Sequence, residues 1–160
     1  MKVGVLLARE PGDLSGWLAT AVAFDVAGAD VLWVDVPPDP ELDPWTLTAA
    51  LAAVTSRSLL VVPTPPPDPR VLATVRRLSR GRLAEAFRPV PGDPGVLEHA
   101  GERWATTDVP ANRAAWQETI HEAAARGTHG LLVPVAPNLL DLLRNPEPPE
   151  ARRDLDLAMG

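Results

Sequence analysis

Three apolar runs of strand length, each followed by a turn and a helix-length segment, limit most strongly what the first half of this chain can fold into. The runs are residues 3–8, 30–36 and 58–62. Apolar runs of this length are typical of strands that are covered on both faces. The segments between them are long enough for crossover helices, which join successive strands in parallel. The pattern therefore predicts an α/β fold in which the first three strands lie side by side.

Helix start and stop signals follow each of these runs. Ser15 is expected to cap the first helix, which Gly28 ends. Asp-Pro pairs at residues 43–44 and 68–69 predict the starts of the second and third helices, because Asp is a preferred N-cap and proline fits the first helical position. Gly81 is expected to end the third helix.

The second half of the chain is less regular. Residues 83–87 have the composition of a short fourth strand, and residues 104–109 are expected to form an extended excursion. Residues 111–126 predict a helix, residues 131–135 a final strand, and residues 139–144 a last helix. Together these patterns predict an α/β domain with a parallel sheet of about four to five strands.

Length and composition set the remaining limits. A chain of 160 residues fits one domain, expected over residues 1–145, and the proline-rich and charged residues 146–160 are expected to form an irregular tail. The formal net charge of −6 argues against a nucleic-acid partner, because such binding depends on clustered Lys and Arg. No apolar run reaches the ~18 residues of a membrane span, so the sequence predicts a soluble, cytoplasmic protein without a membrane partner.

Five segments resemble one known family. They read AGADVLWVD at residues 27–35, DPWTL at 43–47, AALAAVTSR at 49–57, DPRVLA at 68–73 and LSRGRL at 78–83. In this order they resemble the start of the bacterial luciferase-like flavin-dependent monooxygenases.

The resemblance covers residues 1–83 and, more weakly, residues 124–145. It implies a (β/α)8 barrel that binds reduced FMN or the related deazaflavin coenzyme at the C-terminal ends of its strands. Because such a barrel needs about 250 residues, the resemblance implies a truncated TIM-barrel-like fold that lacks the middle of the barrel, including most of the flavin-phosphate segment. The last strand of a closed barrel adjoins the first, so the expected strand order is final, first, second, third, with the fourth strand following where it forms.

A shortened barrel of this kind leaves two sheet edges without a neighbouring strand. Exposed edges pair with another chain or are covered by loops. We therefore expect a homodimer or larger assembly, with two half-barrels completing one barrel, and a compact open sandwich as the alternative.

Candidate site residues follow from the rule that ligands of parallel α/β sheets bind at the C-terminal ends of the strands. The rule selects Arg9, Asp35, Thr64 and Asn138 as cofactor-binding residues. The resemblance places Asp35 at an acidic position that family members often follow with a histidine, but the next residue here is Val36. A catalytic residue is therefore not assigned.

Each of these four residues also has a simpler structural interpretation. Arg9 can contact an anionic cofactor or pair with its neighbouring carboxylate in solvent, and Asp35 can cap or bridge a loop. The hydroxyl of Thr64 can meet a flavin ring or satisfy a turn. Asn138 is an expected N-cap of the last helix, whose N-terminus can also receive a phosphate.

The histidines do not form a metal-binding pattern. His121 lacks a second ligand one helical turn away, and His129 precedes the final strand, at the edge opposite the expected site. His99 falls in the irregular segment and is expected to be free to approach a ligand, which Trp104 in the same segment could cover. The chain has no cysteine, so we expect no metal.

Two functions remain open. The first is a shortened flavin- or deazaflavin-dependent oxidoreductase of the monooxygenase type, in which the cofactor performs the redox chemistry. The second is a non-catalytic relative that acts as a ligand-binding, subunit or assembly protein. The fold alone does not decide between them.

Overall fold

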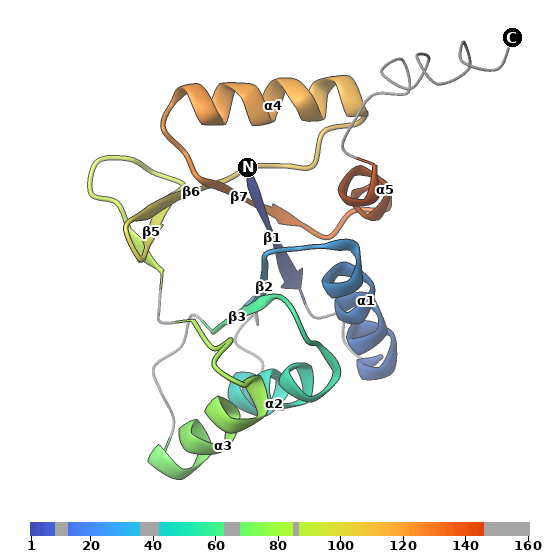
Figure 1. Cartoon of the computed structure of the whole chain (residues 1–160), viewed down its shortest axis with the longest axis vertical. Coiled ribbons are helices and arrows are strands. Elements are labelled where there is room, and N and C mark those ends of the chain that lie inside the picture. Colours follow the sequence, from blue (N-terminus) through green and yellow to red (C-terminus); the bar gives the residue numbers. More distant parts are fainter. Residues whose placement is uncertain (9–12, 36–41, 63–67, 85–86, 146–160) are drawn as a thin grey trace, which may run out of the picture.

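The computed structural model describes residues 1–8, 13–35, 42–62, 68–84 and 87–145. This part of the chain forms one seven-stranded sheet and five helices (Figure 1). The strands are β1 (Lys2–Ala8), β2 (Val31–Asp35), β3 (Leu59–Val61), β4 (Arg88–Pro89), β5 (Val96–His99), β6 (Glu102–Thr106) and β7 (Gly130–Pro134). The helices are α1 (Leu14–Ala27), α2 (Pro44–Val54), α3 (Pro69–Ser79), α4 (Arg113–Ala125) and α5 (Leu139–Arg144). None of the described helices is long and apolar enough to span a membrane.

The strand order is β3-β2-β1-β7-β6-β5-β4. Neighbours from β3 to β6 are parallel, whereas β5 is antiparallel to both β6 and β4. The predicted α/β class and the predicted order of final, first, second and third strands are therefore confirmed. The predicted sheet of four to five parallel strands is wrong in its size and in its uniform direction, because the sheet is mixed and has seven strands.

The extra strands come from the segment between α3 and α4, where the predictions were least accurate. The expected excursion at residues 104–109 is β6 instead, a strand parallel to β7 and joined to β5 by a hairpin. Both residues of that two-residue turn are left-handed, Ala100 with φ 52° and Gly101 with φ 79°, as type I′ hairpins require. Of the predicted strand at 83–87, Leu83 forms an isolated parallel bridge with Leu60, and residues 85 and 86 lie outside the described residues.

The helix caps differ from the predictions at the start of the first helix and at the end of the third, where Arg80 and not Gly81 is the C-cap. Asp13, rather than Ser15, caps α1, because its Oδ1 accepts a hydrogen bond from the backbone N–H of Gly16 at 2.8 Å. The two predicted Asp-Pro starts are confirmed. Asp43 accepts from the N–H of Thr46 at 2.7 Å, and the corresponding Asp of α3 caps its helix in the same way.

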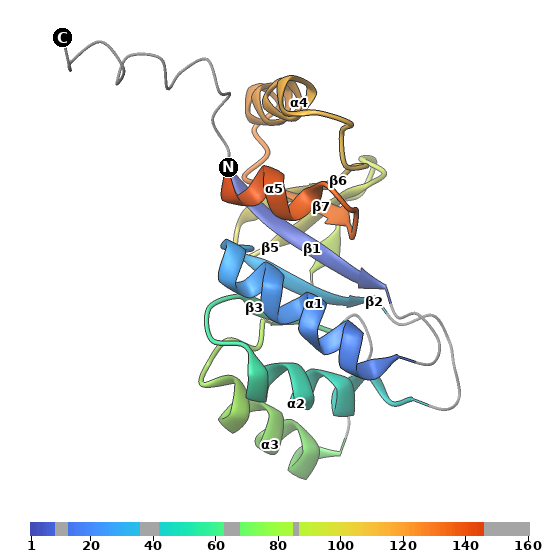
Figure 2. The ribbon, with the colours of Figure 1, turned by 90° about the vertical axis from the view of Figure 1, so that its right-hand side faces the viewer.

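The sheet is curled, with its helices on the outer face (Figures 1 and 2). Leu83 pairs beside β3 at one sheet edge, and Arg88 begins β4 at the other edge. Five Cα–Cα steps separate these residues, so the two edges lie within about 19 Å of each other. The fold is therefore a curled half-barrel, which agrees with the coarser prediction of a truncated β/α fold.

The inner face of this half-barrel has its own apolar core. Phe87 lies at its centre, with its ring centroid 5.3 Å from that of Trp33 and 5.5 Å from that of Trp104, both in edge-to-face geometry. Trp104 is 1% exposed and lies against Gly130 of the neighbouring strand. A Cβ on Gly130 would come within 2.3 Å of the indole ring, so only glycine fits beneath this tryptophan.

A buried carboxylate holds the outer layer together. Asp25 of α1 is 3% exposed and accepts three backbone N–H hydrogen bonds from the loop between α2 and β3: Ser56 at 2.9 Å, Arg57 at 3.0 Å and Ser58 at 2.7 Å. The guanidinium of Arg82 donates to carbonyl oxygens of the same loop and of the last turn of α2. Together these groups fix the end of α2 against α1 and the start of β3.

Candidate functional site

The carboxyl edge of the parallel strands is where the predicted site residues fall. Arg9 and Thr64 lie outside the described residues. Asp35 is the last residue of β2 and is paired in register with Ala8 at the end of β1, although its side chain lies outside the described part of the chain. The structure thus brings the ends of β1, β2 and β7 to one edge, with Asn138 in the turn after β7.

Asn138 occupies the N-cap position of α5, but the predicted side-chain cap is wrong. Its side chain makes no capping hydrogen bond, and its backbone is helical, with φ −89° and ψ −10°. Instead, its Nδ2 donates to the carbonyl oxygen of Pro110 at 2.8 Å. Asn138 therefore joins the turn after β7 to the segment that follows β6, through a donor of its side-chain amide.

A cavity of about 380 Å³ lies at this carboxyl edge. Its walls are the ends of β1 and β7 and the first two turns of α1, contributed by Leu7, Asp13, Gly16, Trp17, Thr20, Pro134 and Val135. The volume is within the usual range for small-molecule sites, and the lining is mostly apolar with a few polar groups, as such sites require.

Trp17 gives this cavity its most distinctive chemistry. The side chain is 7% exposed, and its indole Nε1 is buried with no hydrogen-bond partner among the described residues. A buried N–H without an acceptor costs about 1–3 kcal/mol. Asp13 is the sole ionisable side chain among the described lining residues, and its carboxylate already caps α1. The described lining therefore offers a large aromatic surface and a hydroxyl on Thr20, and none of its described side chains is a free acid or base.

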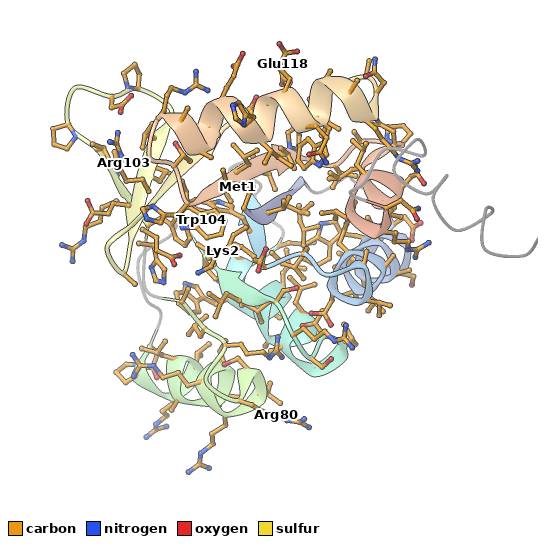
Figure 3. The ribbon with its side chains drawn as sticks, turned by 45° about the horizontal axis from the view of Figure 1, so that its top comes forward. Met1, Lys2, Arg80, Arg103, Trp104 and Glu118 are labelled. Atoms are coloured by element: carbon orange, nitrogen blue, oxygen red, sulfur yellow. The ribbon has the colours of Figure 1, made fainter. Side chains whose placement is uncertain are left out.

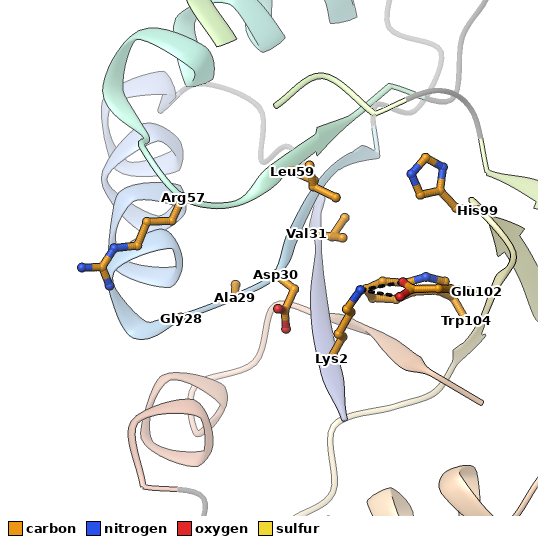
Figure 4. A pocket seen from close by; sticks show the side chains of 10 residues that line it. All are labelled: Lys2, Gly28, Ala29, Asp30, Val31, Arg57, Leu59, His99, Glu102 and Trp104. Carbon is orange, nitrogen blue, oxygen red and sulfur yellow. Dashed lines mark hydrogen bonds and ion pairs between the residues drawn. The ribbon is translucent and has the colours of Figure 1, made fainter. Parts of the chain in front are cut away.

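A second cavity, of about 350 Å³, opens at the opposite, amino edge of the strands (Figure 4). Lys2, Leu59 and Glu102, which begin β1, β3 and β6, line it together with Asp30 just before β2. Trp104 lies beneath, close to Lys2 in Figure 3 as well as in Figure 4. This cavity is the amino-end mouth of the half-barrel interior.

An ion pair crosses the rim of this second cavity. The Nζ of Lys2 lies 2.5 and 2.7 Å from the two carboxylate oxygens of Glu102. The hydrogen bond from Lys2 holds the pKa of Glu102 below its ordinary value, opposed by partial burial and helped by the charges of Lys2, His129 and His99. Asp30 accepts a hydrogen bond from the backbone N–H of Val3 through Oδ2 at 2.7 Å.

His99 and Trp104 are not in an irregular loop, as the sequence had led us to expect. His99 ends β5 and stacks on Phe87, with 4.6 Å between ring centroids and 8° between planes. Trp104 is in β6 and buried, so it forms the floor of the amino-edge cavity instead of a cover. No group of three His, Cys, Asp or Glu side chains in the described ranges is placed to hold a metal ion.

Sequence reasoning missed Trp17 and the whole amino-edge cavity. Trp17 reads as a core residue because it falls on the apolar face of α1, and its orphaned N–H has no signal in the sequence. The amino-edge cavity depends on the hairpin of β5 and β6, which was not predicted. Comparison of the chain with protein-family models, with curated proteins and with solved structures found no match.

Proposed function

We propose that this protein is a shortened homologue of the luciferase-like flavin-dependent oxidoreductases, of the monooxygenase type, that binds FMN or the deazaflavin coenzyme at the carboxyl edge of its sheet. The observation that carries the proposal is the parallel pairing of β7 with β1, beside a 380 Å³ cavity at the carboxyl ends of both strands. Ligands of parallel α/β sheets bind at this edge.

The lining of the cavity supports a ring system more than a phosphate. The indole of Trp17 and the side chains of Leu7 and Val135 supply apolar surface, and the orphaned Nε1 of Trp17 needs an acceptor such as a ring carbonyl oxygen. The N-terminus of α1 is already occupied by the Asp13 carboxylate, which repels a phosphate there. We therefore place the isoalloxazine or deazaflavin ring against Trp17.

Titration of FMN and of the deazaflavin coenzyme, followed by their fluorescence, tests the proposal. We expect saturable binding at micromolar concentrations. Thr20→Phe fills the cavity and should weaken binding at least about tenfold, since it removes the space for the ring. Asp35→Ala and Thr64→Ala should weaken binding as well, because Asp35 ends β2 and Thr64 comes after β3 in the sequence.

The matched control is Asp30→Asn at the opposite edge, which should leave flavin affinity unchanged. Binding of neither coenzyme at micromolar concentrations would refute the proposal. Equal weakening by Thr20→Phe and Asp30→Asn would also count against it, because the loss would then reflect the fold and not the site.

The second candidate is a non-catalytic relative that binds the ligand without turning it over. It is favoured by the absence of a free acid or base among the described residues of the cavity, where Asp13 is engaged in capping. Aerobic reoxidation of photoreduced FMN in the presence of the protein separates the two candidates. A reoxidation rate that differs from that of free reduced FMN supports the oxidoreductase, and binding with an unchanged rate supports the relative.

A further inference from the structure

The amino-edge cavity plays no part in the proposed function, yet it has the features of a separate site. Its floor is apolar and aromatic, formed by Val31, Leu59 and Trp104, with the imidazole of His99 at its side. Above this floor the cavity has a volume of about 350 Å³, which is enough for a single-ring molecule.

Four charged side chains line this cavity, two of them basic and two acidic: Lys2, Arg57, Asp30 and Glu102. Lys2 is held by Glu102, so these two side chains neutralise each other. The guanidinium of Arg57 points away from the cavity in Figure 4. Asp30 remains, with Oδ2 accepting from the N–H of Val3 and Oδ1 making no hydrogen bond within the described part of the chain.

The C-terminal end of α1 adds a partial negative charge next to Asp30. The helix ends at Gly28, which lines the cavity together with Ala29. A helix C-terminus carries a partial negative charge and stabilises nearby cations. Trp104 also lines the cavity, and the face of an indole ring attracts cations. The partial charge at the end of α1 and the aromatic lining therefore both favour a cation with an apolar body.

We propose that this cavity binds a small organic ammonium ion with an aromatic body. The ammonium group lies between the free carboxylate oxygen of Asp30 and the end of α1, and the ring lies on the floor formed by Leu59 and Trp104. This site is independent of the flavin site at the carboxyl edge, so either can fail without the other.

Phenethylamine is the probe, and the indole N–H resonance of Trp104 is the reporter. The chain has five tryptophans, and Trp104→Phe assigns the signal. We expect phenethylamine to shift this resonance, with half-saturation at about 1 mM. A ligand with so few atoms does not bind much more tightly than this. The effect should weaken as salt is added, because the attraction is electrostatic.

Asp30→Asn tests the carboxylate without breaking the fold. The amide oxygen of the asparagine can still accept from Val3, so chiefly the charge is removed. We expect affinity for phenethylamine to fall at least about tenfold, as for loss of a hydrogen bond to a charged group. The matched control is Asp108→Asn at an exposed position, which should bind as the parent protein does.

The anionic analogue 3-phenylpropionate separates charge recognition from apolar binding. We expect it to leave the Trp104 resonance in place at concentrations that saturate phenethylamine. The proposal is overturned if 3-phenylpropionate binds as well as phenethylamine, if phenethylamine produces no shift, or if Asp30→Asn binds as tightly as the Asp108→Asn control.

Discussion

Gly130→Ala is expected to destabilise the protein by about 3 kcal/mol, because overpacking a buried site forces side chains and backbone to move. The added Cβ would lie 2.3–2.6 Å from three ring atoms of Trp104. This side chain belongs to β6 and is buried against β7. Urea denaturation followed by far-UV circular dichroism measures the change as a shift of the midpoint. Because the clash is with one ring, Trp104→Leu should make the same substitution less costly.

Gly101→Ala is the control for this prediction. Gly101 lies in the β5–β6 turn with φ 79°, and a Cβ there would have no heavy atom within 4 Å. Its substitution should cost about 1 kcal/mol, from backbone strain alone. Equal losses for Gly130→Ala and Gly101→Ala would show that Trp104 does not pack on β7 as described.

Asp25→Asn should destabilise the protein by about 3 kcal/mol or more, measured in the same way. The carboxylate is 3% exposed and satisfies three backbone N–H groups of the loop between α2 and β3. An asparagine amide turns one acceptor into a donor that faces these donors, so buried N–H groups are left unpaired. Asp108→Asn, at an exposed position, should change stability by less than about 0.5 kcal/mol.

The same carboxylate predicts how stability depends on pH. Burial raises the pKa of Asp25, but the N–H groups of Ser58, Ser56 and Arg57 and the Ser58 hydroxyl together hold it below its ordinary value. A carboxyl with a lowered folded-state pKa stabilises the fold fully above its unfolded pKa of about 3.9, and this contribution disappears as pH falls through the folded-state pKa. Asp25→Asn should therefore flatten the loss of stability below about pH 4. If Asp25→Asn loses stability below about pH 4 as steeply as the parent protein does, this role of Asp25 is contradicted.

The parts of the fold that the sequence predicted are those with local signals. The Asp-Pro pairs that start α2 and α3 act within one helical turn, and the apolar runs of β1 and β2 identify buried strands without reference to their partners. The hairpin of β5 and β6 was missed because its turn uses Ala100 in a left-handed conformation that alanine rarely adopts. The family resemblance gave the order of β7, β1, β2 and β3, which periodicity alone would not have given.

Other features depend on residues far apart in the chain. Asp25 reads as a polar residue within a helix, and its three donors lie 31 to 33 residues later. Gly130 is required by Trp104, on the neighbouring strand. No local pattern identifies either pair.

The candidate site was predicted in position but not in composition. The strand-end rule selected the carboxyl edge, where the structure has a cavity, but of the four selected residues Asn138 alone has a described side chain, and it binds Pro110 instead. Trp17 and Thr20 line the cavity without having been selected, because both lie within α1 and not after a strand. The homodimer or larger assembly that we expect to form through the sheet edges stays a prediction.

A backbone NMR map of the protein titrated with FMN tests the central claim most directly. We predict that the shifts cluster at the carboxyl edge, around Leu7, Thr20 and Val135, and include the indole N–H of Trp17. Shifts confined to the amino edge around Lys2 and Glu102, or no shifts at micromolar FMN, would contradict the account.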